Sequence, residues 1–307
     1  MKKLFILPFI FLLLACTKSD DPTTTVDLKT VLGVAQSDSP LGEGLFFEDI
    51  NYGERERQQL DILFPESGNP KGVVLFFHGG GFIGGDKDQA FDELLLETMQ
   101  ALLDENIAIV SANYTLLTTA GNEGVISALE DGTLVIDFIQ DRLVKLNIPA
   151  NKIVLAGTSA GAGIAQWNGF KNNINTQVQG VLAIAAQSTY DLYEWENVFP
   201  GFSLDDLRQI SPFLETLFIE FYGAEPTQAE LDAVDYRDFM DATDPALYVY
   251  NFAGDELINA LGEIDFDVLY HSFRHADYLR AKAIEVEQEF SGIFQETPGD
   301  FVIRVLD

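Results

Sequence analysis

The chain has 307 residues, and its 49 acidic side chains outnumber its 18 lysines and arginines to give a formal net charge of −31. Such acidity argues against nucleic acid or an anionic lipid surface as a ligand, because both are polyanions. The single cysteine leaves no intrachain disulfide and no cysteine metal cluster to consider. The chain is long enough for one domain with a large apolar core, and its sequence shows no internal repeat.

The N-terminus has the pattern of a bacterial lipoprotein leader. Lys2 and Lys3 precede an apolar stretch, residues 4–14, that is too short to cross a bilayer as a helix. The stretch ends in Ala15-Cys16, and Cys16 is the only cysteine. We therefore expect a signal peptide over 1–15 and a lipid, such as palmitate, on Cys16 that holds the protein at the outer membrane of the cell envelope.

Residues 16–43 are polar and read as an acidic tether. Its first part, 17–21, is either an export signal to the cell surface or only the beginning of that tether. Residues 44–307 then form the globular domain. Removing residues 1–15, with their two lysines, would change the net charge from −31 to −33.

The globular part begins with two antiparallel strands, 45–52 and 57–64, and then alternates between apolar strands and helices. The expected elements are strand 73–77, helix 88–105, strand 107–112, helix 124–146, strand 152–156, helix 160–170 and strand 180–186. Near-continuous apolar strands that alternate with helices predict an α/β fold with a mostly parallel sheet, covered on both faces. Ligands of such sheets bind beyond the carboxyl ends of the strands.

Two glycine motifs fall at those carboxyl ends. Gly157-Thr158-Ser159-Ala160-Gly161 follows the apolar run 153–156 and has the pattern of a nucleophile elbow, so we expect Ser159 on a sharp turn with φ above zero. His78-Gly79-Gly80-Gly81 follows the run 73–77. Glycines there leave backbone N–H groups open, so we expect those of Gly80, Gly81 and Ala160 to converge as an oxyanion hole.

At these residues the chain resembles the α/β-hydrolases, of the hormone-sensitive-lipase-like and feruloyl-esterase-like carboxylesterase type. The resemblance covers about residues 45–307, and Tyr52-Gly53, Gln59-Leu60-Asp61-Ile62 and Gly84-Gly85-Asp86-Lys87 extend it. It implies a sheet of about eight strands and hydrolysis of carboxylic esters through an acyl-enzyme, with no cofactor and no metal. Short acyl esters, acylated sugars and feruloyl-type esters are the substrates to consider.

The family commonly has a cap between the sixth and seventh strands, which here corresponds to about residues 190–240. This stretch is rich in aromatic residues. They either bind the substrate or form the small core of the cap itself, and we favour the second reading for most of them.

By the same resemblance, Asp255 orients a catalytic histidine and His78 is structural. The family places that histidine after the eighth strand. The sequence predicts a helix over about 274–294 and an eighth strand over 301–306, so the segment after strand eight would be missing and the base would lie beyond Asp307.

Three explanations remain open: a truncated copy of a longer enzyme, which we favour; recruitment of His271 or His275 as the base; or an inactive relative that acts as a binding protein. Both histidines read more readily as surface or helix-start residues. Without an efficient base the chain would be a poor esterase. The alternating Glu263, Asp265 and Asp267 could bind a hard cation, but a plain acidic loop is the better interpretation.

Overall fold

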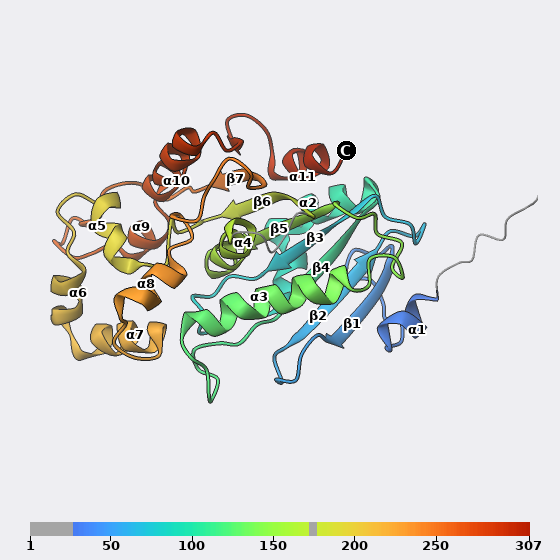
Figure 1. The fold of residues 1–307 in the computed structure, drawn as a ribbon, viewed down its shortest axis with the longest axis horizontal. Coiled ribbons are helices and arrows are strands. Elements are labelled where there is room, and N and C mark those ends of the chain that lie inside the picture. The colour runs from blue at the N-terminus through green and yellow to red at the C-terminus, as the bar shows by residue number, and fades with distance from the viewer. Residues whose placement is uncertain (1–26, 172–176) are drawn as a thin grey trace, which may run out of the picture.

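The computed structural model describes residues 27–171 and 177–307, and its centre is one eight-stranded sheet (Figure 1). The strands lie in the order β1-β2-β4-β3-β5-β6-β7-β8. Their bounds are β1 Leu45–Asn51, β2 Gln59–Phe64, β3 Gly72–Phe77, β4 Ile107–Ala112, β5 Ile153–Thr158, β6 Val178–Ile184, β7 Ala246–Tyr250 and β8 Phe290–Gly292. Cys16 and the expected signal peptide lie outside the described residues.

The sheet is antiparallel at one edge and parallel elsewhere, as the sequence predicts. β1 pairs antiparallel with β2, and β2 pairs antiparallel with β4. All other neighbouring pairs run parallel. β3 and β5 are direct neighbours, with Phe77 opposite Gly157. The two glycine motifs that follow these strands are therefore brought side by side at one edge of the sheet.

Both faces of the sheet are buried, because side chains along the central strands alternate between two cores. In β3, Val73, Leu75 and Phe77 belong to one core, whereas Val74 and Phe76 belong to the other. The first core packs against α3 (Val125–Gln140), α4 (Ala160–Phe170) and α10 (Phe273–Val286). The second packs against the 3₁₀ turn η1 (Lys87–Phe91), α2 (Glu93–Asp104) and α11 (Pro298–Leu306). This two-faced arrangement is the α/β-hydrolase fold that the sequence predicts.

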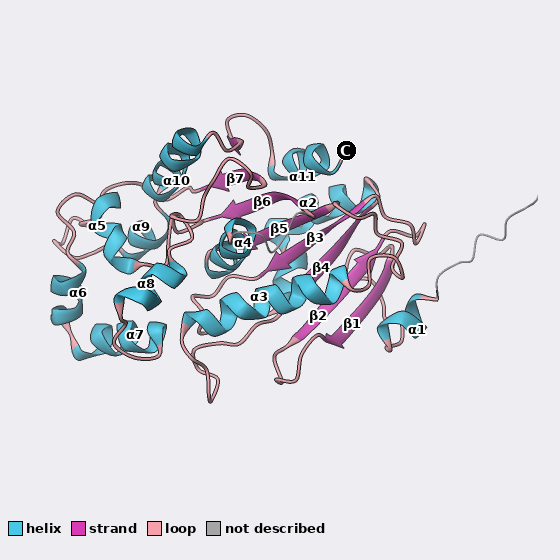
Figure 2. Cartoon of the chain, in the orientation of Figure 1, coloured by secondary structure: helices cyan, strands magenta, loops and turns pink. Residues whose placement is uncertain are grey.

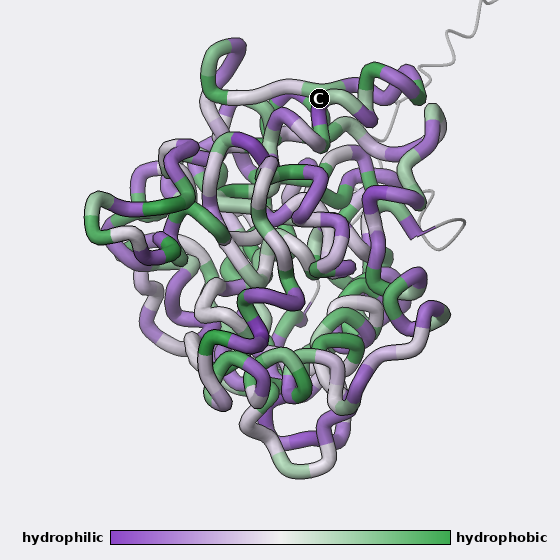
Figure 3. Tube along the Cα trace, turned by 90° about the vertical axis from the view of Figure 1, so that its left-hand side faces the viewer, coloured by the Kyte–Doolittle hydropathy of each residue, from purple (hydrophilic) through white to green (hydrophobic). Residues whose placement is uncertain are grey.

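A cap of short helices lies between β6 and β7 in the chain and beyond the carboxyl ends of the parallel strands (Figures 1 and 2). It consists of η2 (Leu192–Glu194), α5 (Trp195–Val198), α6 (Leu204–Ile210), α7 (Pro212–Tyr222) and α8 (Gln228–Val234). Figure 3, which turns the cap end of the molecule toward the viewer, shows hydrophobic and hydrophilic residues interspersed along the trace. A core of its own, with Trp195, Phe199 and Phe218, holds the cap to α9 (Phe266–His271). Some aromatic residues thus form the core of the cap, while others, described below, face a cavity.

The C-terminal part differs from the sequence prediction. Residues 298–306 form the helix α11, not a strand, and the eighth strand is the short β8 within the stretch predicted as helix. Thr297 caps α11 by accepting a hydrogen bond from the Asp300 N–H (3.1 Å), and Pro298 occupies the first turn. These capping residues are the sequence signal that the apolar run 301–306 obscured.

The N-terminal part also differs in detail. A short helix, α1 (Leu28–Leu32), begins within the range read as a tether. Leu28 and Leu32 are buried in the same core as β3 and α4. From residue 27 onward this segment is therefore packed on the domain. Within the described ranges, no helix combines the length and the apolar character needed to cross a bilayer.

Candidate active site

Ser159 lies on a strained turn between β5 and α4. Its backbone has φ 50° and ψ −116°, and its N–H donates to the Ile184 carbonyl (2.8 Å). The turn requires glycine on both sides: a Cβ on Gly157 would collide with the Gly161 backbone, and one on Gly161 with the Phe77 carbonyl oxygen. The predicted positive φ is confirmed, and such a turn lifts the serine hydroxyl out of the end of the sheet.

The glycine loop after β3 lies against this elbow. A Cβ built on Gly79 would be 3.6 Å from the Ser159 Cβ. Gly80 (φ 117°) and Gly81 (φ 60°) form a tight turn, in which the Gly80 carbonyl accepts from the Ile83 N–H (3.1 Å). Across the described part of the chain, the N–H groups of Gly80, Gly81 and Ala160 have no hydrogen-bond acceptor. All three residues line the cavity that also contains Ser159, so their donors are available to an oxyanion there.

His78 holds this loop in place and does not face Ser159. Its ring is buried and stacks on Tyr114, with 4.3 Å between the centroids. Arg57 donates to His78 Nε2 (3.2 Å), so the Nδ1–H faces the Gly79 carbonyl oxygen (2.6 Å). Burial lowers the pKa of His78 to about 4, which keeps the imidazole neutral. The structural role expected for His78 agrees with this network.

The histidine beside the nucleophile is His271. Its Nε2 lies 3.0 Å from Ser159 Oγ, within hydrogen-bond distance. His271 is the last residue of α9, in the connection between β7 and α10, and not in a segment after the eighth strand. The expectation that the base lies beyond residue 307 rested on a strand at 301–306, which the structure does not have. Of the three explanations left open, recruitment of His271 fits this geometry.

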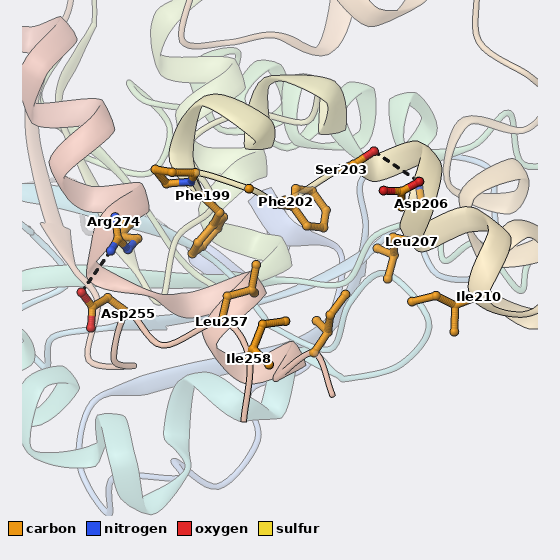
Figure 4. A pocket seen from close by; sticks show the side chains of 13 residues that line it. Phe199, Phe202, Ser203, Asp206, Leu207, Ile210, Asp255, Leu257, Ile258 and Arg274 are labelled. Atoms are coloured by element: carbon orange, nitrogen blue, oxygen red, sulfur yellow. Dashed lines mark hydrogen bonds and ion pairs between the residues drawn. The ribbon is translucent and has the colours of Figure 1, made fainter. Parts of the chain in front are cut away.

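The carboxylate beside that histidine is Asp267, not Asp255. His271 Nδ1 lies 2.8 Å from Asp267 Oδ1, one helical turn away on α9. Asp255 instead forms an ion pair with Arg274 Nη2 (3.1 Å, Figure 4). The prediction for Asp255 therefore needs correction, because the loop after β7 directs its carboxylate to Arg274. The i, i+4 spacing of Asp267 and His271 was the sequence signal that could have identified the pair.

His275, the other candidate base, is fully buried away from Ser159. Its Nδ1 accepts a hydrogen bond from the Ser188 N–H (3.2 Å), and its Nε2 donates to the Leu269 carbonyl oxygen (2.9 Å). Desolvation lowers the pKa of His275 to about 4, so it remains neutral and both bonds persist. It supports α9 and does not take part in the proton transfer geometry.

Two more side chains, those of the buried Gln187 and the half-buried Asn251, hold the segment that carries His271. Gln187 Nε2 donates to the Tyr270 carbonyl oxygen (2.8 Å), and Asn251 Nδ2 donates to that of Ser272 (2.9 Å). Together with His275 they form what we call the α9 clamp. A six-residue helix has little intrinsic stability, so these bonds fix the position of its terminal histidine.

The acidic residues near α9 serve the helix itself. Asp265 caps α9 by accepting from the N–H groups of Asp267 (3.0 Å) and Val268 (3.2 Å). Within the described residues, no three His, Cys, Asp or Glu side chains come together as metal ligands. Asp265 thus serves as the cap of α9, and Asp267 contacts His271.

A Ser–His–Asp constellation at the elbow of an eight-stranded sheet, next to a glycine loop with open N–H groups, defines the α/β-hydrolase class. Residues 60–268 match the BD-FAE family, and the chain belongs to it. It is 28% identical to Carboxylesterase 20 of Arabidopsis thaliana over 146 residues, which cover 44% of this chain and 42% of that protein. Arylacetamide deacetylase-like 2 of Homo sapiens is 32% identical over 96 residues, 30% of this chain and 22% of the relative.

Solved structures share the fold at low sequence identity. A bifunctional GH43-CE protein of Bacteroides eggerthii superposes with a TM-score of 0.64 at 17% identity, over 88% of this chain and 36% of that one. Thermogutta terrifontis esterase 2, phosphonylated by sarin, gives a TM-score of 0.57 at 15% identity, over 85% of this chain and 83% of that one. The chain spans less than half the length of the curated relatives named here and of the bifunctional protein.

Proposed function

We propose that the protein is a serine esterase that hydrolyses carboxylic esters through an acyl-enzyme. The observation that carries this proposal is the chain of contacts from Ser159 Oγ to His271 Nε2 (3.0 Å) and from His271 Nδ1 to Asp267 Oδ1 (2.8 Å). The esterases and the deacetylase-like protein among its relatives support the same reaction.

In the first half of the reaction, Ser159 Oγ attacks the ester carbonyl carbon while His271 Nε2 takes the hydroxyl proton. The carbonyl oxygen becomes an oxyanion that the N–H groups of Gly80, Gly81 and Ala160 receive. Asp267 holds the Nδ1–H tautomer and stabilises the imidazolium. Collapse of the intermediate breaks the ester C–O bond, and His271 returns the proton to the leaving alcohol.

In the second half, a water molecule attacks the acyl-enzyme carbonyl and His271 accepts its proton. The same N–H groups receive the second oxyanion. Collapse releases the carboxylic acid and restores the Ser159 hydroxyl. The position of His271 at the C-terminal end of α9 favours the transient imidazolium, because carbonyl groups carry partial negative charge there.

A fluorophosphonate probe tests this function directly, since it reacts with activated serines. Labelling should occur, should map to Ser159, and should be lost in Ser159→Ala. Ser188→Ala is a matched control, because Ser188 also contacts a histidine (Oγ to His275 Nδ1, 3.0 Å) but is fully buried. Absence of labelling in the folded wild type would instead support the alternative of an inactive hydrolase-fold binding protein.

The N-terminal sequence supports a location for this activity. We propose that cleavage before Cys16 and acylation of its thiol and new amino group anchor the protein to the bacterial outer membrane. The substrate would then be a small-molecule or carbohydrate ester outside the cytoplasm. Cys16→Ala should abolish labelling by radioactive palmitate and release the protein from membranes. Unchanged labelling would reject the anchor while leaving the esterase proposal intact.

A further inference from the structure

The cavity beside Ser159 is walled in large part by the cap and is mostly apolar. Its volume is about 520 Å³, within the range of pockets that enclose small ligands. Side chains from the cap form much of its wall, among them Leu192, Leu204, Leu214, Leu217 and Phe218. The body of the protein contributes Phe82 and Leu117. We call this cavity the acyl chamber.

Most polar side chains of the acyl chamber already have hydrogen-bond partners within the protein. Tyr190 donates its hydroxyl to the Ala160 carbonyl oxygen (3.0 Å). Gln187 uses its amide N–H groups on the carbonyls of Ala185 (3.3 Å) and Tyr270 (2.8 Å). Tyr270 itself is 38% exposed and lies at the rim beside Phe266. The interior therefore offers a ligand few hydrogen-bond partners apart from the reacting groups.

Arg208 is the one cation among the chamber residues, and its charge is fully compensated. Glu215 and Glu225 each receive two hydrogen bonds from its guanidinium, at 2.6–3.0 Å, and Tyr193 Oη receives another (2.9 Å). These contacts use Nε, Nη1 and Nη2, and the guanidinium also stacks on Phe218 (3.9 Å to the centroid). Two carboxylates around one guanidinium leave a net negative charge, so this site does not attract an anionic ligand.

We propose that the acyl chamber binds the acid half of the ester as an uncharged alkyl chain of medium length. This inference rests on the proposed function and names its substrate class. A sugar or a uronate inside the chamber would lose hydrogen bonds to water without replacement, which is unfavourable. An alkyl chain needs no such partners and gains free energy for each methylene that leaves water. A sugar can still be the alcohol half, outside the chamber.

A second pocket, lined by apolar side chains together with Ser203, Asp206, Asp255 and Arg274, adjoins the acyl chamber and bears on the length of this chain. It has a volume of about 370 Å³ and includes Leu257, Ile258 and Ile210 (Figure 4). Phe202 and Leu207 line both this pocket and the acyl chamber, so their side chains form the wall between the two. Removal of part of that wall should extend the chamber and admit longer chains.

The test is kcat/KM for p-nitrophenyl acetate, butyrate, hexanoate, octanoate and laurate, with methyl ferulate as the aromatic alternative. We expect kcat/KM to rise by about two- to fourfold per methylene up to the medium-chain esters. Leu217→Trp should reduce octanoate turnover by about tenfold or more while acetate changes by less than about threefold. Leu207→Ala should move the optimum toward laurate. Leu94→Trp, at a position 94% exposed on α2, is the matched control and should change neither.

The outcomes separate this inference from the proposed function. A profile that is flat, that is highest for acetate, or that favours methyl ferulate over octanoate would overturn the alkyl-chain proposal while the esterase function stands. An unchanged profile in both Leu217→Trp and Leu207→Ala would overturn it equally. No turnover of any ester, together with no fluorophosphonate label on Ser159, would reject the function and this inference with it.

Discussion

At the scale of single residues, the chemistry depends on which carboxylate orients His271. Asp267 contacts its Nδ1, but the Asp267 side chain is 67% exposed, unlike the buried aspartate of a typical Ser–His–Asp triad. Water competes with the imidazole for an exposed carboxylate and weakens the interaction. We therefore expect Asp267 to contribute less than a buried triad aspartate and still more than Asp255.

The first prediction compares these two aspartates. Asp267→Asn should lower kcat by about 10- to 1000-fold, below the loss of about 10⁴-fold seen when a buried triad aspartate is changed. Asp255→Asn removes only the ion pair with Arg274 and should change kcat by less than about threefold, because such exposed pairs are weak. Steady-state hydrolysis of p-nitrophenyl butyrate by both variants decides the matter. A larger loss in Asp255→Asn would restore the role that the sequence assigned to it.

Most of the nucleophile site could be predicted from the sequence, because its glycines are local requirements. On either side of Ser159, Gly157 and Gly161 stand where a close backbone approach excludes a side chain, and Gly80 and Gly81 have a positive φ that favours glycine. His271 and Asp267 could not be assigned in the same way. Their roles depend on where the long β7–α10 connection folds, and only the cap packing against α9 and the α9 clamp determine that.

At the scale of elements, the position of α9 decides whether the histidine reaches the serine. The second prediction concerns the α9 clamp. His275→Leu removes the bond to the Leu269 carbonyl and leaves that acceptor buried, which costs about 1–3 kcal/mol of folding free energy. Because α9 would then move relative to Ser159, kcat should fall by about tenfold or more with KM nearly unchanged. His275→Gln, which keeps a donor, should recover part of kcat. A loss of stability with unaltered kcat in His275→Leu would show that the clamp is only structural.

The third prediction is a pH dependence of stability that arises from His275. Its pKa is about 4 in the folded protein against an ordinary value of 6.5, so the folded state binds fewer protons. The contribution of neutral His275 to the stability of the folded state is therefore fully present above pH 6.5 and is lost as the pH falls toward 4. Between about pH 7 and 4.5 the stability advantage of the wild type over His275→Gln should shrink by about 2–3 kcal/mol. Urea unfolding at both pH values measures it, and a constant difference would contradict this account.

Helix α11 shows why one element was predicted wrongly. The run Phe301-Val302-Ile303 fits a strand or a buried helix equally well, and length does not distinguish them. The capping residue Thr297 and Pro298 favour a helix locally. Phe301 and Val302 belong to the second of the two cores, the one that packs against α2. The short β8 has only three residues, and its pairing with β7 comes from tertiary contacts that no periodic pattern announces.

At the scale of the whole molecule, the pattern of apolar strands and helices was sufficient to predict the first six strands of the sheet, β1 to β6. Strands that are buried on both faces can be recognised from their continuous apolar runs alone. A helix that connects two such strands predicts that the strands lie parallel in the sheet. The cap was predicted only through family resemblance, since its short helices carry weak periodic signals.

The fourth prediction follows from the net charge of −31. Repulsion among so many carboxylates opposes the compact state, and salt screens it over a Debye length of about 10 Å at 0.1 M ionic strength. The melting temperature should therefore rise between about 10 and 150 mM sodium chloride. Choline chloride should give the same rise, because screening does not depend on the identity of the cation. A decrease with both salts would show that attractive ion pairs dominate, such as those of Arg208 with Glu215 and Glu225 and of Arg304 with Glu289 and Glu296.

The most direct test of the whole account is the turnover of p-nitrophenyl butyrate by His271→Ala relative to the wild type, in protein whose thermal unfolding is unchanged. His271 Nε2 lies 3.0 Å from Ser159 Oγ, in the position of the general base. We predict that kcat falls by at least about 10³-fold, because loss of the base leaves only the oxyanion hole and substrate binding. A His271→Ala variant that retains kcat within about threefold of the wild type would contradict the assignment of His271 as the general base, because the reaction would then proceed without it.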